Sequence, residues 1–220
     1  MGGEMTIKLV DGFAIRNMID PSFGSIHRHG TELAKPGVRW YIPEGEVWVD
    51  HIYAKSGELE FLLQMDEAGD KYIEKNPEGD YRTFLKGFCE KGVPPDFYKS
   101  TIVVNGNSVV KVDGAIVRKY LDPEFIMGGH EFVYDYVPQS EIWLDAWLDE
   151  RELPYVLNHE QLERNFMKDG MSYDDAHEYA TASEKAMRVK DGVGNYLGYA
   201  GMDWRNKTNK EIVSKFYVGN

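Results

Sequence analysis

The chain has 220 residues, 42% of them hydrophobic, and its 37 acidic and 25 basic residues give a formal net charge of −12. This size and composition allow one large domain or two small domains, each with its own core. The acidic balance, with no basic patch, argues against a surface for nucleic acid or anionic membranes. The single cysteine, Cys89, excludes an internal disulfide and a thiolate metal site. We find no signal-like or membrane-length apolar run and expect a soluble, cytoplasmic protein.

An internal repeat organises the chain. Residues 10–23 align without gaps on residues 112–125 and share Val, Asp, Gly, Arg, Asp, Pro and Phe. The match resumes over residues 41–50 and 136–145, which share Tyr, Pro, Glu, Trp and Asp. A repeat spacing of about a hundred residues indicates two related domains, because solenoid units are much shorter. We therefore predict an α+β fold of two repeated small domains, each with a few antiparallel strands followed by helices.

The predicted boundaries follow from the repeat and from turn-forming residues. Lys91-Gly-Val-Pro-Pro-Asp96 has the composition of a connection between domains. The tail contains two possible edge strands, over residues 195–200 and 212–218. The predicted organisation is a first repeat over residues 1–90, a linker over 91–107, a second repeat over 108–190 and a tail over 191–220.

Short β-branched or alternating runs predict the strands of each repeat. Residues 6–10 and 108–112 end in Asp-Gly, a turn signal, so each run is predicted to open a hairpin whose second strand carries Ile15 or Val117. Alternation also favours strands that precede the helices. These further predicted strands cover residues 38–42, 46–50, 132–137 and 141–145.

Two helices are predicted to close the second repeat. The first runs from about Glu152 to Lys168, with Pro154 tolerated in the opening turn and Gly170 available for the C-terminal cap. The second starts at Ser172, a capping residue followed by Asp175, and runs to about Arg188.

The apolar face of the first helix carries two ionisable residues, His159 and Glu163. Taken at 100° per residue, the side chains of Tyr155, Val156 and Phe166 fall within a quarter turn of His159. A carboxylate removed from water without a partner is costly or loses its charge. A bound metal ion is one explanation for an ionisable pair on a core-facing stripe.

The second helix offers matching groups. His177 and Glu184 lie on its inner face, and a tight turn makes the two helices an antiparallel hairpin. We therefore predict that His159, Glu163 and His177 converge as metal ligands, with Glu184 as a fourth ligand or an acceptor for an imidazole N–H. Imidazole and carboxylate ligands suit zinc, and also manganese, iron or nickel, and three protein ligands leave one coordination position open.

The strand over residues 141–145, a short acidic connection and a helix with His159-Glu160-x-x-Glu163 resemble the minimal core of the zincin metallopeptidases. The wider pattern adds Tyr173-Asp-x-Ala-His177 and Glu184, and over residues 112–188 it is similar to uncharacterised zincin-like proteins of phages and bacteria. Where standard zincins carry a second histidine, this chain has Glu163.

The resemblance implies a zincin-like strand–helix–helix core and a metal-dependent hydrolase, with zinc as the expected metal, that acts on a peptide or amide bond. Glu160 takes the place of the zincin glutamate that accepts a proton from the attacking water. The partner is then a peptide or protein, and the location is a host cytoplasm or a virion if a phage encodes the chain.

The first repeat lacks these groups. With one gap in the alignment, Met65 stands over His159, Asp66 over Glu160 and Gly69 over Glu163. We expect no metal in the first repeat at this position, and we infer that the scaffold does not require the ionisable residues.

An alternative interpretation needs no metal. Glu160 then forms an exposed i, i+4 pair with Arg164, and the chain is a non-catalytic phage-type structural, accessory or anti-defence binding protein. His130 could line the same cleft, although we expect a loop histidine to lie at the surface. The buried structural network of this alternative pairs His159 with Glu184, and Glu163 with His177 or Arg188.

Overall fold

The computed structural model describes residues 5–28, 41–195 and 214–219. The chain divides into two compact units, residues 1–79 with 192–220 and residues 80–191. The described residues form seven α-helices and two small sheets of three and four strands, so the predicted α+β class is confirmed. No helix in this part of the chain is long and apolar enough to cross a membrane.

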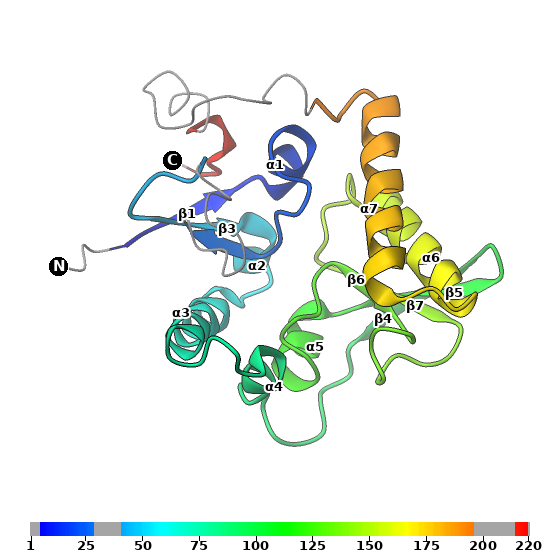
Figure 1. The fold of residues 1–220 in the computed structure, drawn as a ribbon, viewed down its shortest axis with the longest axis horizontal. Helices are drawn as coiled ribbons and strands as arrows, with labels where there is room; N and C mark the ends of the chain where they lie inside the picture. Colours follow the sequence, from blue (N-terminus) through cyan, green and yellow to red (C-terminus); the bar gives the residue numbers. More distant parts are fainter. Residues whose placement is uncertain (1–4, 29–40, 196–213, 220) are drawn as a thin grey trace. The chain divides into compact units, whose positions relative to one another are not determined.

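Each unit places strands and helices in a similar order (Figure 1). The first unit contains β1 (Thr6–Val10), α1 (Gly12–Met18), β2 (Ile26–Arg28), β3 (Glu46–Asp50), α2 (His51–Lys55), α3 (Leu59–Lys75) and the short 3-10 helix η2 (Ser214–Phe216). The second contains α4 (Tyr81–Lys86), β4 (Tyr98–Val104), β5 (Asn107–Val112), α5 (Gly114–Tyr120), β6 (Gly128–His130), β7 (Glu141–Asp145), α6 (Leu153–Lys168) and α7 (Tyr173–Lys190).

The two sheets share one topology. In the first, the strand order is β1-β3-β2, with β1 parallel and β2 antiparallel to β3. In the second, the order is β4-β5-β7-β6, with β5 parallel and β6 antiparallel to β7, and β4 adds an antiparallel edge strand. The prediction of antiparallel strands alone is therefore wrong, because the connections that contain α1 and α5 return the chain to the same direction and allow the parallel pairs β1–β3 and β5–β7.

The predicted Asp-Gly hairpins are also wrong. Asp11 caps α1 through its side chain, which accepts a hydrogen bond from the Ala14 amide at 3.1 Å, whereas Asp113 stands at the N-cap of α5 without a side-chain capping hydrogen bond. A Cβ atom on Gly12 would collide with the carboxylate of Asp50, and one on Gly114 with that of Asp145. The glycines therefore allow a buried carboxylate to approach a helix N-terminus, and Ile15 and Val117 lie on helices.

That carboxylate is part of a buried ion pair in each unit. Arg16 pairs with Asp50 at 3.0 Å in the first unit, and Arg118 pairs with Asp145 at 2.8 Å in the second. Each arginine also donates from Nη1 at 2.9 Å to a backbone carbonyl seven residues on, that of Phe23 or Phe125. Arginine and aspartate thus join α1 to the end of β3 and α5 to the end of β7, beside a core built around Trp48 or Trp143.

Several other predicted segments differ. Residues 132–137 form turns instead of a strand, and the predicted linker over 91–107 contains β4, which pairs with β5 as a hairpin. Of residues 38–42, only 41 and 42 are described, and they begin a turn. In the tail, residues 196–200 lie outside the described residues. Residues 214–216 form η2, and Tyr217 makes an isolated antiparallel bridge with Val10.

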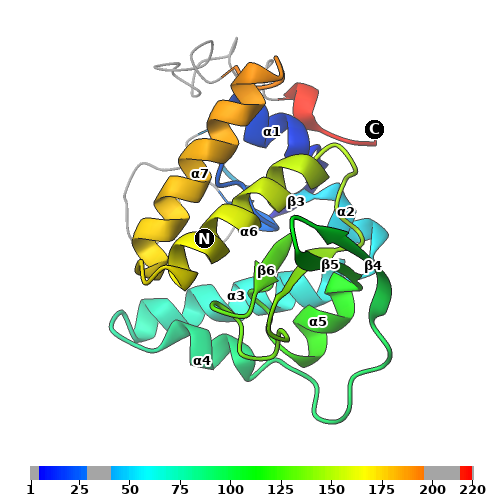
Figure 2. The same ribbon diagram turned by 90° about the vertical axis from the view of Figure 1, so that its right-hand side faces the viewer.

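Helices α6 and α7 form the predicted antiparallel hairpin (Figures 1 and 2). The turn between them uses Gly170, whose φ of 95° is accessible to glycine at little cost. The Ser172 side chain caps α7 by accepting from the Asp175 amide. Helix α6 packs against β6 and β7, so its inner stripe faces this end of the sheet.

Candidate metal centre

Three elements of the second unit bring histidine and glutamate side chains together. Helix α6 supplies His159 and Glu163, helix α7 supplies His177 and Glu184, and the edge strand β6 supplies His130. His130 is fully buried and Glu163 nearly so, whereas the side chain of His177 is 48% exposed. The cluster is therefore enclosed by the sheet on one side and reaches solvent at α7.

One atom from each of the three predicted ligands points to a common position. His159 Nε2 lies 3.2 Å from His177 Nδ1 and 3.3 Å from Glu163 Oε2, and His177 Nδ1 lies 2.7 Å from the same oxygen. Metal–ligand bonds of about 2.0–2.1 Å in a tetrahedral site place neighbouring ligand atoms roughly 3.3 Å apart. Small adjustments of these three side chains therefore suffice to hold a metal ion.

A chain of charged side chains fixes the ring of His159. Its Nδ1 lies 3.0 Å from Glu184 Oε2, and the other oxygen of Glu184 accepts from Arg188. Arg188 is itself buried against Glu152, at 2.5 Å. When the ring is neutral, a carboxylate on Nδ1 keeps the remaining proton there and leaves the lone pair of Nε2 directed at the cluster, as in many metal-binding histidines.

His130 orients the second oxygen of Glu163. Its Nδ1 accepts from the Phe132 amide at 3.3 Å, so its Nε2 carries the proton and donates to Glu163 Oε1 at 3.1 Å. Burial opposes the charged form of Glu163, but the hydrogen bonds from His130, His159 and His177 outweigh it and hold the pKa of this carboxyl well below its usual range. Glu163 is therefore an anion.

The electrostatics of His159 follow from the same contacts. Burial alone disfavours its charged ring, but the hydrogen bonds to Glu163 and Glu184 prevail and raise the pKa of His159 to about 10. Burial likewise opposes the charge of Glu184, yet His159 and Arg188 lower the pKa of its carboxyl. The ring of His159 is therefore protonated and places a positive charge between the carboxylates of Glu163 and Glu184. A metal cation bound at this cluster would take the place of that proton.

Glu160 lies on the flank of α6 and is 8% exposed. Its carboxyl packs against Gly128 of β6, where a Cβ atom would press on it. Burial, with the nearby negative charge of Glu163, raises the pKa of Glu160 to about 8, although His159 opposes this shift. The alternative partner Arg164 pairs instead with Glu131, at 2.8 and 2.6 Å.

A second donor set exists but is a poorer metal site. His130, Glu160 and Glu163 each offer a ligand atom within 4.8 Å of the others. However, the Phe132 amide occupies Nδ1 of His130, so Nε2 could bind a cation only by losing its proton and leaving an imidazolate. The geometry therefore favours the first set, and His130 serves as a support for Glu163.

The structure thus brings His159, Glu163 and His177 together and places Glu184 behind His159, as the sequence predicts. The expectation that His130 lies at the surface is wrong. Helical periodicity cannot reveal His130, because it lies on a strand far from α6 in the sequence. The available signal was its repeat position, since Arg28 and His130 occupy equivalent places opposite Val47 and Ile142.

The first unit has a different arrangement at the matching position. Arg28 of β2 forms an ion pair with Asp66 of α3, with its Nε 2.7 Å from Asp66 Oδ2, and a longer one with Asp70 at 3.5 Å. Met65 stands where α6 has His159. Within the described residues, no metal-ligating group of three side chains is found in this unit.

Comparison of the chain with protein-family models, with curated proteins and with solved structures found no match.

Proposed function

We propose that the second unit is a metal centre and that the chain is a zincin-like hydrolase of peptide or amide bonds. The observation that carries the proposal is the convergence of His159 Nε2, His177 Nδ1 and Glu163 Oε2 within 2.7–3.3 Å of one another. The contact of Glu184 with the remote nitrogen of His159 supports it, because ligating histidines usually donate that N–H to a carboxylate.

The donor set favours zinc. Two imidazoles and one carboxylate match the three-ligand composition of catalytic zinc sites, which leave a position open for water or substrate. Manganese, iron or nickel would accept the same ligands. The half-exposed side chain of His177 supports access from solvent on the α7 side.

Each residue then has a role in the proposed hydrolysis. A bound divalent cation supplies Lewis acidity toward water and a substrate carbonyl. Glu160 accepts a proton from the attacking water and returns it to the leaving amine, and a carboxyl with a pKa of about 8 is suited to both steps near neutral pH. Glu184 holds the His159 ring, and His130 keeps Glu163 charged and aimed at the cation.

We further propose that the two units are copies of one domain. Their shared strand order, the Arg–Asp pair at matching positions and the Trp–Glu contact of each central strand support this, with Trp48 on Glu46 and Trp143 on Glu141, both at 2.8 Å. In this interpretation the first copy lacks the site and serves another purpose.

Metal content tests the centre. Tag-free chain should contain about one divalent ion per molecule by mass spectrometry, and His159→Ala should lose it. Met65→Ala changes the matching position of the first unit and is the control that should retain the ion. Absence of metal from the wild-type chain, even after incubation with zinc, would contradict the proposed metal centre.

Glu160→Gln tests the hydrolase. With a complex peptide mixture as substrate and mass spectrometry as readout, the wild-type chain should cut at defined bonds, and the variant should retain its metal and lose cleavage by about a hundredfold or more. Undiminished cleavage by the variant would remove Glu160 from the role of base. No cleavage by metal-loaded wild type would count against hydrolysis alone.

A second candidate, a non-catalytic binding protein, is favoured by one observation. The contacts from His159 to Glu184 and from His177 to Glu163 satisfy the cluster internally. In that case His159→Ala would change stability without changing metal content, so the same measurement separates the two candidates.

A further inference from the structure

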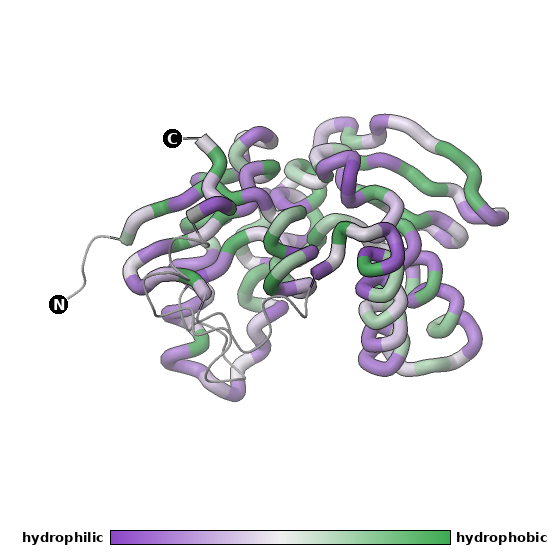
Figure 3. The backbone as a smooth tube through the Cα atoms, turned by 90° about the horizontal axis from the view of Figure 1, so that it is seen from above, coloured by the Kyte–Doolittle hydropathy of each residue, from purple (hydrophilic) through white to green (hydrophobic). Residues whose placement is uncertain are grey.

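The free edge of the second sheet has the properties of a docking strand. Strand β4 lies at the end of the order β4-β5-β7-β6, and within the described residues its outer edge pairs with nothing. Ile102 is 58% and Val103 73% exposed. Figure 3 shows this hydrophobic run beside the polar tip of the hairpin. An exposed β-branched edge strand without proline favours pairing with another strand.

The hairpin geometry identifies the outward groups. Asn105 and Gly106 both have positive φ, 51° and 81°, and form a two-residue turn that makes Val104 and Asn107 the closing pair. Hydrogen-bonded and non-hydrogen-bonded pairs alternate from there. The amide and carbonyl groups of Thr101 and Val103 therefore face the free edge.

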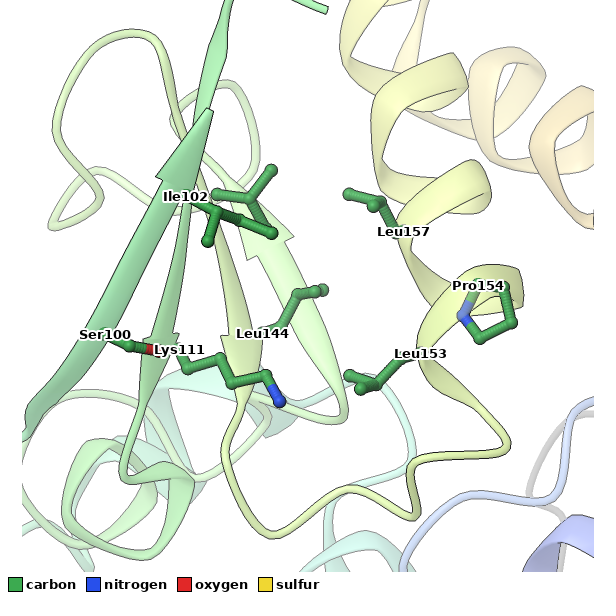
Figure 4. Close-up of a pocket in the computed structure, with 8 residues that line it drawn as sticks. Ser100, Ile102, Lys111, Leu144, Leu153, Pro154 and Leu157 are labelled. Atoms are coloured by element: carbon green, nitrogen blue, oxygen red, sulfur yellow. The ribbon is translucent and has the colours of Figure 1, made fainter. Parts of the chain in front are cut away.

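An apolar pocket lies beside this edge, on the sheet face that α6 covers. It has a volume of about 150 Å³ and lies between strands β4, β5 and β7 and the first turns of α6. Figure 4 shows Ile102 and Leu144 on the sheet facing Leu153 and Leu157 on the helix. The volume suits one aliphatic side chain and is too small for an extended hydrophobic ligand.

A lysine gives the pocket a charge. The side chain of Lys111, on β5, runs along the sheet with its ammonium group toward the helix (Figure 4). No carboxylate pairs with it in the described part of the chain. Lys111 stands opposite Ser100 in the β4–β5 register, so it lies on the same face as Ile102. An aliphatic pocket and a free cation therefore lie side by side along one edge.

We propose that β4 binds an extended acidic peptide segment of a partner as an added strand. The backbone of the segment pairs with Thr101 and Val103, one aliphatic side chain enters the pocket, and an acidic side chain two positions away contacts Lys111. A second copy of this chain is a poorer occupant, because β4 carries Lys99 and no acidic residue. The docking site is separate from His159 and does not depend on a bound metal.

Two seven-residue probes test the proposal on the full chain, measured by fluorescence anisotropy. The acidic probe is Thr-Asp-Thr-Leu-Thr-Asp-Thr, which presents leucine with an acid on each side in either strand direction, and the basic probe replaces both aspartates with lysine. We expect the acidic probe to bind with a Kd below about 1 mM and at least about tenfold more tightly than the basic probe.

Three variants locate the binding. Val103→Pro removes an outward amide and leaves the β5-facing hydrogen bonds intact, so it should abolish binding, whereas Val103→Thr should retain it. Lys111→Glu should reverse the preference between the probes, a gain that a misfolded protein cannot produce. An amide NMR spectrum confirms that each variant is folded.

Failure of the acidic probe to bind, equal binding to the Val103→Pro variant, or an unchanged preference in Lys111→Glu would overturn the proposal. So would sedimentation showing that the wild-type chain forms dimers that Val103→Pro dissociates, because a second copy would then be the occupant of the edge.

Discussion

The two units use the same scaffold and fill one position on it differently. In the second unit, the helix after the central strand faces the edge strand with Glu163 against His130, and His159 contacts the same glutamate. In the first unit, the corresponding helix faces the corresponding strand with Asp66 against Arg28. The arrangement in the first unit needs no added cation, because Arg28 supplies the positive charge beside Asp66. The other has two carboxylates and three imidazoles and leaves room for an added cation.

This difference distinguishes the residues that the shared fold requires from the residues that belong to the candidate metal site. The Arg–Asp pair at the helix N-terminus occurs in both units, at Arg16–Asp50 and Arg118–Asp145. Among the residues that the structure describes, the histidine cluster occurs in the second unit alone. The shared pair therefore belongs to the scaffold, and the cluster is an addition that the scaffold tolerates. The predictions below test this division, beginning with the largest expected effect.

The shared ion pairs should be essential to stability in both units. Removing one partner of a buried pair leaves an uncompensated charge and costs about 3–5 kcal/mol. We expect Arg16→Met and Arg118→Met each to lower the free energy of unfolding by this amount in urea titrations followed by circular dichroism. A loss below about 1 kcal/mol in either variant would show that the pair is not a scaffold element.

The ligand histidines should determine the metal affinity of the second unit and have little effect on the first unit. We expect His177→Ala to weaken zinc affinity more than a hundredfold, because loss of a ligand exceeds the roughly 10–100-fold cost of losing a supporting group. Competition with a chromophoric chelator measures the affinity. The matched control is Tyr179→Ala on the same helix, whose side chain is largely exposed and should be dispensable. Equal affinity of His177→Ala and wild type would contradict the assignment.

Glu160 should make the stability of the metal-free chain depend on pH. Its pKa is about 8 in the folded chain against 4.5 for an ordinary glutamate, so the folded state holds the proton more tightly. The stabilisation is complete below about pH 4.5 and is lost as the pH rises through 8, by an amount on the order of a few kcal/mol. Chemical unfolding at several pH values measures this.

Glu160→Gln supplies the reference for that experiment, because an amide does not titrate. We expect a flatter stability profile between pH 5 and about 8 in the variant. Burial also raises the pKa of Asp66 in the first unit, although Arg28 opposes that shift, so Glu160→Gln should flatten the profile without removing its whole slope. Identical profiles for wild type and Glu160→Gln would show that Glu160 is not held in a raised-pKa environment.

The supporting residues should have the smallest effects. Glu184→Gln replaces the charged acceptor of His159 by a neutral amide, and His130→Phe removes the donor to Glu163. We expect each to lower zinc affinity about 10–100-fold without abolishing binding. Chelator competition compares them with His177→Ala. If either variant lost metal as completely as His177→Ala, that residue would be a ligand and its supporting role would be wrong.

Sequence periodicity predicted the parts of the site that lie on helices. The stripe of α6 and the capped start of α7 placed His159, Glu163, His177 and Glu184 on facing surfaces, because helical side chains three and four apart share a face. The central strands over residues 46–50 and 141–145 were also predicted at these positions, although they are buried on both faces and not half-buried as the alternation indicates.

The failures share a physical cause. Asp11-Gly12 and Asp113-Gly114 have the sequence of a turn, but each glycine meets a buried carboxylate from a distant strand. That partner is invisible in a local window. His130 was missed for the same reason, because its surroundings come from α6. Long-range contacts therefore decided both the helix starts and the support of Glu163.

Anomalous diffraction at the zinc edge, from crystals of the zinc-loaded chain, tests the metal centre most directly. We predict one ion per chain, bound by His159 Nε2, His177 Nδ1 and an oxygen of Glu163 at about 2.0–2.2 Å, with none beside Met65. A chain without any anomalous peak, or one whose ion is held by His130 and Glu160, would contradict the proposed centre.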